Sequence, residues 1–133
     1  MNATDRPVPT ADDDNRPFLD AWREGRLMIQ RARGGGRPFF YPRPVCPYTG
    51  SRDLEWIEAS GRGRIVSYSL LMRPNHPAFN DEVPIILAEI GLEEGASLLA
   101  GVLARPEDVR SGLEVRLAAN DGGKHPMPVF TPA

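Results

Sequence analysis

The sequence predicts one mostly β domain with a small N-terminal appendage. A chain of 133 residues is long enough for one core and too short for two independent domains of usual size. Its 13 Gly and 14 Pro favour short strands joined by turns over long helices. Apolar residues also alternate with polar ones in several short segments of the C-terminal half, which is typical of half-buried strands.

The N-terminal region predicts a flexible tail followed by a short amphipathic helix. Residues 1–15 are polar, contain Pro and include three successive Asp, so we expect them to form a tail. In "NRPFLDAWREG", Asn15 is placed to cap a helix and Gly25 to end it. The apolar side chains of this segment share one face of the helix: Phe18, Leu19 and Trp22.

The next segment predicts a hairpin with a loose turn. "RLMIQRA" and "RPFFYP" flank three glycines, Gly34 to Gly36, and the chain's one cysteine, Cys46, follows. We therefore assign residues 16–53 to the helix and a degenerate, zinc-ribbon-like hairpin.

Residues 54–133 predict a five-stranded OB-fold barrel. The first strand is expected at residues 65–72, and two apolar strands at 85–92 and 96–103 flank a Glu-Glu-Gly turn. "RPEDVRSG" has the start and stop signals of a short helix, and "LEVRLAA" and residues 129–130 supply two more strands. Three strands, a helix and two strands is the order of an OB barrel, although a split β-sandwich has a similar pattern.

The composition indicates the cellular compartment in which the protein works. No apolar run approaches the length that crosses a bilayer, and the N-terminus lacks the basic and apolar regions of a secretion signal. A single cysteine cannot form an internal disulfide, which agrees with a reducing compartment. We therefore expect a cytoplasmic protein that has no membrane partner.

Positive charge is concentrated in one part of the chain. Residues 22–73 hold ten Arg against four acidic residues, whereas the formal net charge of the chain is −2. Arginine binds phosphates and carboxylates through a planar, two-pronged donor, so an anionic ligand near this half is one interpretation. The other interpretation is an arginine-rich surface that pairs with the protein's own acidic residues.

Several segments together resemble a known family. The helix ending "EGRL", the hairpin, "SRDLEWIEASGRGRIVSYSLL", "LEEGASLLAGVL" and "VRSGLEVRL" are similar to the acyl-CoA-associated OB-fold family with an N-terminal rubredoxin-like zinc ribbon. Members of that family are accessory subunits or fused domains that work beside thiolase-like enzymes, acyltransferases, hydratases and aldolases acting on CoA esters, including those of sterol side-chain breakdown. The resemblance implies a non-catalytic accessory subunit, which engages the CoA ester and requires a larger acyl-CoA enzyme subunit as partner, with a thiolase-like subunit as the first expectation.

The family's zinc ligands are largely absent from this sequence. The resemblance places the four cysteine positions of the ribbon at Ala32, Gly35, Cys46 and Thr49, so three of four thiolates are missing. Neither histidine stands at a spacing that would replace them. We expect no zinc and no other cofactor, and the hairpin is then expected to be a protein-protein element.

Four residues are candidates for contact with the CoA ester. Arg62 and Arg64 flank a glycine in "GRGR" and could bind phosphates, while Trp56 and Tyr68 could stack on the adenine. The alternatives are structural: the glycines would bend a barrel strand, and the two aromatic side chains would be core residues.

The aromatic residues of the helix and hairpin are candidates for the partner interface. They provide more apolar surface than a short appendage is expected to bury alone, and arginines surround them in sequence. The candidate set is Phe18, Leu19, Trp22, Phe39, Phe40 and Tyr41.

Two other functional classes compete with the accessory subunit. OB barrels commonly bind single-stranded nucleic acid, but this chain is net acidic and has one lysine, so nucleic acid is the weaker expectation. A stand-alone enzyme would need His76 with Asp81 and Glu82 as acid-base groups, or Cys46 as a nucleophile. Such residues are ordinary in a polar loop and in a packed core, and we therefore predict no catalytic residues.

Overall fold

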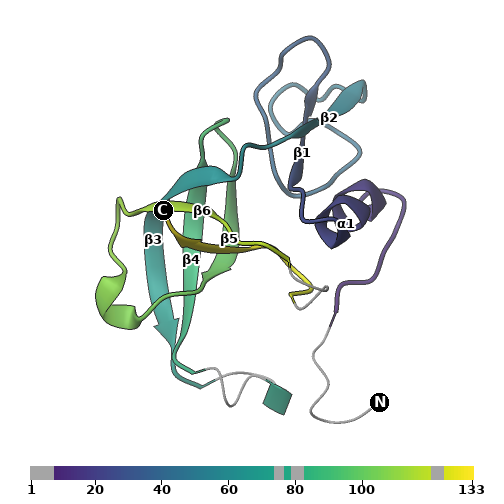
Figure 1. Ribbon diagram of the computed structural model, residues 1–133. Coiled ribbons are helices and arrows are strands. Elements are labelled where there is room, and N and C mark those ends of the chain that lie inside the picture. Colours follow the sequence, from purple (N-terminus) through teal and green to yellow (C-terminus); the bar gives the residue numbers. More distant parts are fainter. Residues whose placement is uncertain (1–7, 74–76, 79–82, 121–124) are drawn as a thin grey trace.

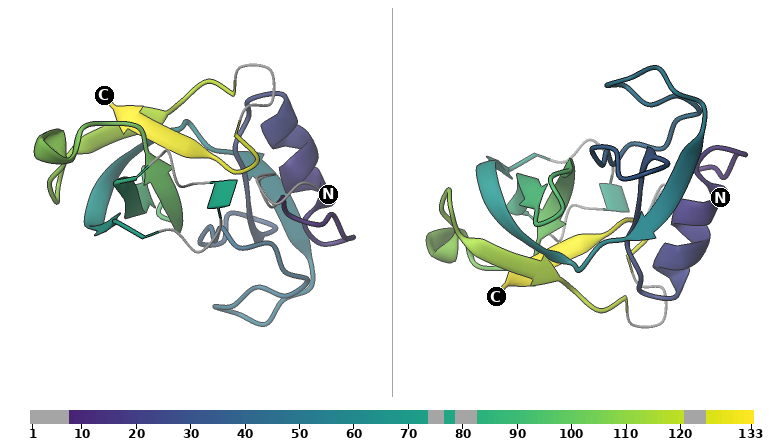
Figure 2. Two further views of the ribbon diagram at one scale, coloured as in Figure 1. Left: turned by 90° about the horizontal axis from the view of Figure 1, so that it is seen from below. Right: turned by 90° about the horizontal axis from the view of Figure 1, so that it is seen from above.

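The computed structural model describes residues 8–73, 77–78, 83–120 and 125–133. It contains one short α-helix, a two-stranded sheet and a closed five-stranded barrel. The loop grouping of His76, Asp81 and Glu82 lies outside the described residues. Figures 1 and 2 show that the helix and the small sheet both lie at one side of the barrel.

The predicted helix is present as α1 (Arg16–Arg23), with Pro17 in its first turn. Asn15 precedes the helix, but its side chain does not cap it. The Asn15 Oδ1 atom instead accepts a hydrogen bond from the N–H of Asp12 at 2.8 Å, and Asp12 Oδ1 accepts from the N–H of Asn15. The aspartate run therefore forms a tight turn that leads into α1. Gly25 adopts a φ of 80° just after the helix, a conformation that glycine permits.

The ribbon sheet has a different second strand from the one the sequence predicts. β1 (Met28–Ala32) pairs antiparallel with β2 (Leu54–Glu58), and residues 37–42 contribute only a single bridge, Gln30 to Phe39. Pro38 and Pro42 have no N–H to donate to a strand ladder, which explains why this segment does not pair along its length. β2 lies within residues 54–133, which the sequence predicts to form the barrel, but it pairs with β1 in the ribbon sheet.

The barrel has the strand order β3-β4-β5-β7-β6, closed by pairing of β6 with β3. Its strands are β3 (Arg62–Leu71), β4 (Ile85–Leu92), β5 (Ser97–Val102), β6 (Glu114–Leu117) and β7 (Val129–Pro132). The predicted OB-fold barrel is confirmed, and the split sandwich is wrong because the sheet closes on itself. The short helix predicted between β5 and β6 is only the 3-10 turn η2 (Pro106–Asp108).

β3 is bent by a bulge near its middle. Its register with β4 shifts between Ile65 and Ser67, while β6 pairs only with the first three residues of β3. A bulge adds local twist, which lets one strand take part in the closure of a barrel and then continue beyond it. Residues 66–72 are consequently all exposed.

One hydrophobic core joins the helix, the ribbon and the barrel. Phe18 and Leu19 of α1, Ile29 of β1 and Phe40 belong to the same buried cluster as the inward-facing barrel residues. The Phe18 and Phe40 rings meet edge to face with their centroids 5.3 Å apart. The N-terminal region is therefore part of the folded domain and packs on the barrel directly.

Trp22 makes a second connection between helix and barrel. It is 2% exposed, and its Nε1–H donates a hydrogen bond to the carbonyl of His125 at 2.8 Å. The side chain of Asn120 in turn donates to the carbonyl of Trp22 at 2.9 Å. These bonds attach α1 to the connection between β6 and β7. In the described part of the chain, no helix is long and apolar enough to span a membrane.

Candidate anion-binding site

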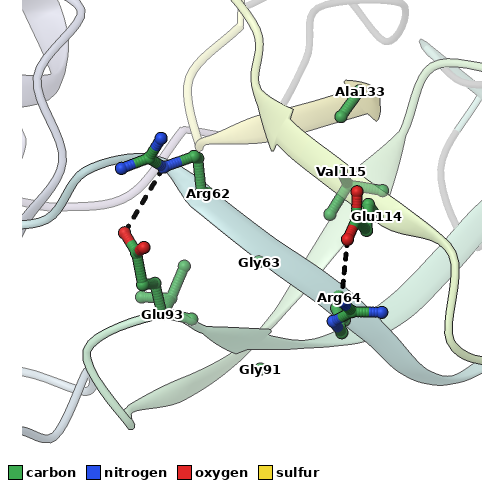
Figure 3. Close-up of a pocket in the computed structure, with 9 residues that line it drawn as sticks. Arg62, Gly63, Arg64, Gly91, Glu93, Glu114, Val115 and Ala133 are labelled. Carbon is green, nitrogen blue, oxygen red and sulfur yellow. Dashed lines mark hydrogen bonds and ion pairs between the residues drawn. The ribbon is translucent and has the colours of Figure 1, made fainter.

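Arg62 and Arg64 lie on the outer side of the barrel, in a shallow hollow of about 430 Å³. The start of β3, the end of β4, the start of β6 and the C-terminal residue meet here, as Figure 3 shows. The two arginines are two positions apart on β3 and therefore project from the same side of the strand. The hollow is lined by Arg62, Gly63, Arg64, Gly91, Leu92, Glu93, Glu114, Val115 and Ala133.

Each arginine holds a carboxylate of the acidic C-terminal half. Arg62 Nε lies 3.4 Å from Glu93 Oε2, and Arg64 Nη2 donates a hydrogen bond of 2.7 Å to Glu114 Oε1 (Figure 3). All four side chains remain more than half exposed, so these ion pairs are well solvated and contribute little to stability. Of the two interpretations of the arginine-rich segment, pairing with the protein's own acidic residues is thus correct for Arg62 and Arg64.

The hydroxyl of Ser60 organises the acidic side of the hollow. Ser60 Oγ donates to Glu93 Oε2 at 2.8 Å and accepts from the N–H of Arg62 at 3.1 Å. This hydrogen bond from Ser60, followed by the charge of Arg62, lowers the pKa of Glu93 from its ordinary value. Glu93 is consequently held in its charged form beside Arg62.

A third arginine lies beside the predicted pair. Arg116 of β6 is exposed and stands directly opposite Arg62 of β3 in the strand register. Like charges directly opposite each other on neighbouring strands are destabilising, and in this structure Glu93 lies beside Arg62, while Arg116 does not line the hollow. Alternation within "LEVRLAA" placed Arg116 on the outer face, but the sequence could not show which strand would pair with β6.

The glycines of "GRGR" have structural roles. Gly61 has a φ of 86°, and a Cβ added to Gly63 would lie 2.7 Å from the carbonyl oxygen of Gly91 on β4. Gly63 therefore allows β3 to approach the backbone of β4 closely. This agrees with the alternative that the glycines serve the barrel structure and not a ligand. The arginine side chains remain as the groups of this motif that can contact a ligand.

The two aromatic candidates lie apart from each other. Trp56 is on β2 of the ribbon sheet, half-buried against the hydrophobic core, and it does not lie on the barrel as predicted. Tyr68 is on β3, 40% exposed, in the part of the strand beyond the bulge. Neither residue lines the hollow. The structure therefore keeps the two arginines together and separates both aromatic residues from them.

Five of the six interface candidates are buried in this chain's own core. Their exposed fractions are between 2% and 7%: Phe18, Leu19, Trp22, Phe39 and Phe40. The expectation that a separate protein covers these five side chains is therefore wrong, because the helix and ribbon bury them in a core that they share with the barrel. Tyr41 differs. It is 49% exposed, and its hydroxyl accepts a hydrogen bond from the N–H of Leu99 on β5 at 3.2 Å.

The ribbon retains one of its two knuckles. Cys46 is 2% exposed, its N–H donates to the Ser51 carbonyl, and Gly50 donates to the Cys46 carbonyl. A hydrogen bond from the Thr49 side chain, assisted by the backbone N–H groups of Tyr48 and Thr49, lowers the pKa of the Cys46 thiol. Thr49, which stands at a cysteine position of the family, thus contacts the remaining cysteine directly.

The residues present do not fit a zinc ion. Cys46 is the one thiol of the four family positions, and the described residues hold no group of three or more His, Cys, Asp or Glu that could bind a metal. The backbone at the other knuckle position does not suit a cysteine. Gly35 adopts a φ of 94°, a conformation in which a cysteine would be strained.

Comparisons with known proteins agree with this architecture. Two family models match, "ChsH2, rubredoxin-like zinc ribbon domain" over residues 19–55 and "ChsH2, C-terminal OB-fold domain" over residues 56–120. A probable enoyl-CoA hydratase alpha subunit of Thermomonospora curvata is 35% identical over 130 residues, which are 96% of this chain. The chain spans only 40% of the length of that subunit.

Two further relatives match most of their own length. A DUF35 domain-containing scaffold protein of Pyrococcus furiosus is 33% identical over 100 residues, covering 72% of this chain and 73% of that protein. A chain of the solved structure "Ltp2-ChsH2(DUF35) aldolase" superposes with a TM-score of 0.79 and 32% identity, covering 93% of this chain and 98% of the other. The chain therefore belongs to the ChsH2/DUF35 family, in which a rubredoxin-like zinc ribbon precedes an OB-fold domain.

Proposed function

We propose that this chain is a non-catalytic accessory subunit of an acyl-CoA-processing enzyme, such as a thiolase-like enzyme, acyltransferase, hydratase or aldolase. The observation that carries the proposal is the match, over nearly the whole of both chains, to a component of the Ltp2-ChsH2(DUF35) aldolase. Relatives named as hydratase alpha subunits and as scaffold proteins support the same role. In this proposal, the larger subunit supplies the catalytic groups, and the acyl chains handled include those of lipid or sterol side-chain breakdown.

The arginine hollow is the proposed contact for the CoA part of the substrate. Arg62 and Arg64 project from one side of β3, and Arg116 stands opposite Arg62. Guanidinium groups form charge-assisted hydrogen bonds to phosphate oxygens, and the phosphates of CoA present several such oxygens. A bound phosphate would take the place that Glu93 or Glu114 occupies beside each arginine, exchanging one solvated ion pair for another. Trp56 and Tyr68 do not line this hollow, so this binding mode assigns them no contact.

Co-purification tests the accessory role. A tagged chain returned to its native organism should recover a larger acyl-CoA enzyme subunit in fixed stoichiometry, identified by mass spectrometry and by turnover of a CoA ester. The isolated chain should show no turnover, because the reaction needs the catalytic groups of the larger subunit. Turnover by the isolated chain, or recovery of no acyl-CoA enzyme, would contradict the proposal.

Single-stranded nucleic acid remains the second candidate ligand, because the barrel fold and a cluster of arginines suit a phosphate backbone. An affinity for single-stranded DNA that falls steeply with salt, together with no acyl-CoA enzyme as partner, would favour it.

A further inference from the structure

Four leucine side chains gather on the outer side of the barrel, where an ordinary solvated sheet has polar residues. Their exposed fractions are 37% for Leu71, 40% for Leu87, 58% for Leu99 and 47% for Leu103. Antiparallel sheets that face water on one side normally alternate apolar residues inside with polar residues outside. Exposed apolar side chains that lie together on one surface, unlike ones scattered singly, mark a surface that binds another protein.

The strand register places these leucines on one face. Leu87 of β4 stands opposite Gly101 of β5, between Leu99 and Leu103, and Ser69 of β3 lies on its other side. Ala88 and Ala100, the neighbours of Leu87 and Gly101 along each strand, face the interior and are buried. We call the outer surface formed by Leu71, Leu87, Leu99 and Leu103 the leucine face. Because Gly101 and Ser69 are small, this surface has no bulky polar side chain at its centre.

Two residues with polar groups, Glu89 and Tyr41, lie at the border of the leucine face. Glu89 stands opposite Leu99 and is half-buried, and none of the ion pairs or side-chain hydrogen bonds among the residues that the structure describes involves it. A partner that covered this carboxylate would have to offer it a basic or hydrogen-bonding group, since a buried unpaired charge is costly. Tyr41 is the one exposed member of the predicted interface set. It lies at the other border, where its hydroxyl accepts a hydrogen bond from the N–H of Leu99.

The leucine face and the arginine hollow lie on the same outer side of the sheet. Arg64 is paired with Gly91, and Ser67 with Glu89, so both pairs point away from the core to which Ile65 and Ile90 contribute. Leu71 is seven positions after Arg64, which is about 23 Å along an extended strand. A protein seated on the leucine face would therefore extend towards the arginines without passing around the barrel.

We infer that the leucine face is the docking surface for the larger acyl-CoA enzyme subunit, an inference that rests on the proposed function. The partner surface is apolar and carries a basic side chain opposite Glu89. Docking there positions the catalytic subunit beside the arginine hollow, so that one CoA ester can contact both chains. A second copy of this chain is the competing occupant. Pairing two copies through the open edge of β3 would leave Leu99 and Leu103, two strands away, uncovered.

The test uses the larger subunit that co-purifies with the unmodified chain, identified by mass spectrometry and produced recombinantly. Leu99→Asp and Leu87→Asp each place a carboxylate on the leucine face, and we expect each to weaken binding of this subunit by about 100-fold. Leu99→Ala, which removes apolar contact without adding charge, should weaken it by about tenfold. Ser111→Asp, an equal charge at an exposed turn between β5 and β6, is the matched control and should change the Kd by less than about twofold.

Circular dichroism and thermal unfolding establish that each variant is folded, which the exposure of Leu99 leads us to expect. If Leu99→Asp and Leu87→Asp bind the larger subunit as tightly as the unmodified chain, the assignment is overturned while the proposed function stands. Light scattering that shows a dimer of this chain, dissociated by these variants with the larger subunit still bound, would assign the face to a second copy. Recovery of no acyl-CoA enzyme by the unmodified chain would overturn the proposed function and this docking surface together.

Discussion

The guanidinium of Arg64 can satisfy either Glu114 or a ligand phosphate. Its 2.7 Å bond to Glu114 is short, yet both side chains are more than 60% exposed, so water screens the pair. A phosphate that carries more charge and more acceptor oxygens than a carboxylate should compete well for the same donor. Glu93 and Glu114 then act as internal competitors of the ligand, and removing their charge becomes informative.

Glu114→Gln should strengthen the binding of a CoA ester to the assembled complex. The amide cannot form the ion pair with Arg64 and does not repel a phosphate, so we expect KM for the ester to fall by about three- to tenfold. Glu107→Gln, an exposed acid in η2 that does not line the hollow, is the control and should leave KM unchanged. An unchanged or higher KM for Glu114→Gln would show that phosphate does not reach Arg64.

The ribbon residues support a metal-free fold. We expect the purified protein to contain no stoichiometric zinc and a chelator to leave its thermal unfolding unchanged, because there is no metal-binding free energy to lose. The structural reasons are that Cys46 is the one thiol of the four ligand positions and that a cysteine would be strained at the φ of Gly35. Elemental analysis that finds about one zinc per chain would contradict this.

At the scale of elements, the sequence identified most strands but not all of their partners. Alternation located β3 to β6, and the turn at Glu93, Glu94 and Gly95 located the β4–β5 hairpin. Periodicity could not reveal that β1 pairs with β2 and passes over residues 37–42, because a pairing depends on which backbone donors are free. Periodicity also could not place Arg116 beside Arg62, because that position follows from the pairing of β6 with β3 that closes the barrel.

Trp22 of helix α1 packs against this chain's own barrel and not against a separate protein. Trp22 was expected to face a separate protein, but its ring is buried and its Nε1 is bonded to His125. Trp22→Ala should therefore lower the free energy of unfolding by about 3–5 kcal/mol. Trp22→Phe, which keeps most of the packing and loses one hydrogen bond, should cost about 1–2 kcal/mol.

Chemical denaturation of the two Trp22 variants distinguishes these cases, with co-purification measured in parallel. Trp22→Phe should stay folded and still recover the larger subunit. If Trp22→Ala unfolds at the same denaturant concentration as the unmodified chain but no longer recovers its partner, then Trp22 is an interface residue as the sequence had suggested.

At the scale of the whole molecule, one core unites the ribbon and the barrel and leaves the functional groups on the outer surface. Composition led us to expect the aromatic residues outside and the arginines at a ligand. The fold instead buries the aromatic residues at the junction of ribbon and barrel, and it exposes leucines in the apolar segments that form β3, β4 and β5 and the residue after β5. Sequence alone could not separate these cases, since an apolar residue in a strand is consistent with either face until the register is known.

In the proposed function, this chain contributes CoA-ester binding to a larger enzyme through its arginine hollow. The most direct measurement is KM for a CoA ester in the complex that contains Arg62→Ala/Arg64→Ala, compared with Arg52→Ala, an exposed arginine of the ribbon. Each charge-assisted contact contributes about 1.5–3 kcal/mol, so we expect the double variant to raise KM at least tenfold while the complex still forms, with no change for Arg52→Ala. A KM that stays the same in an intact complex would contradict the claim.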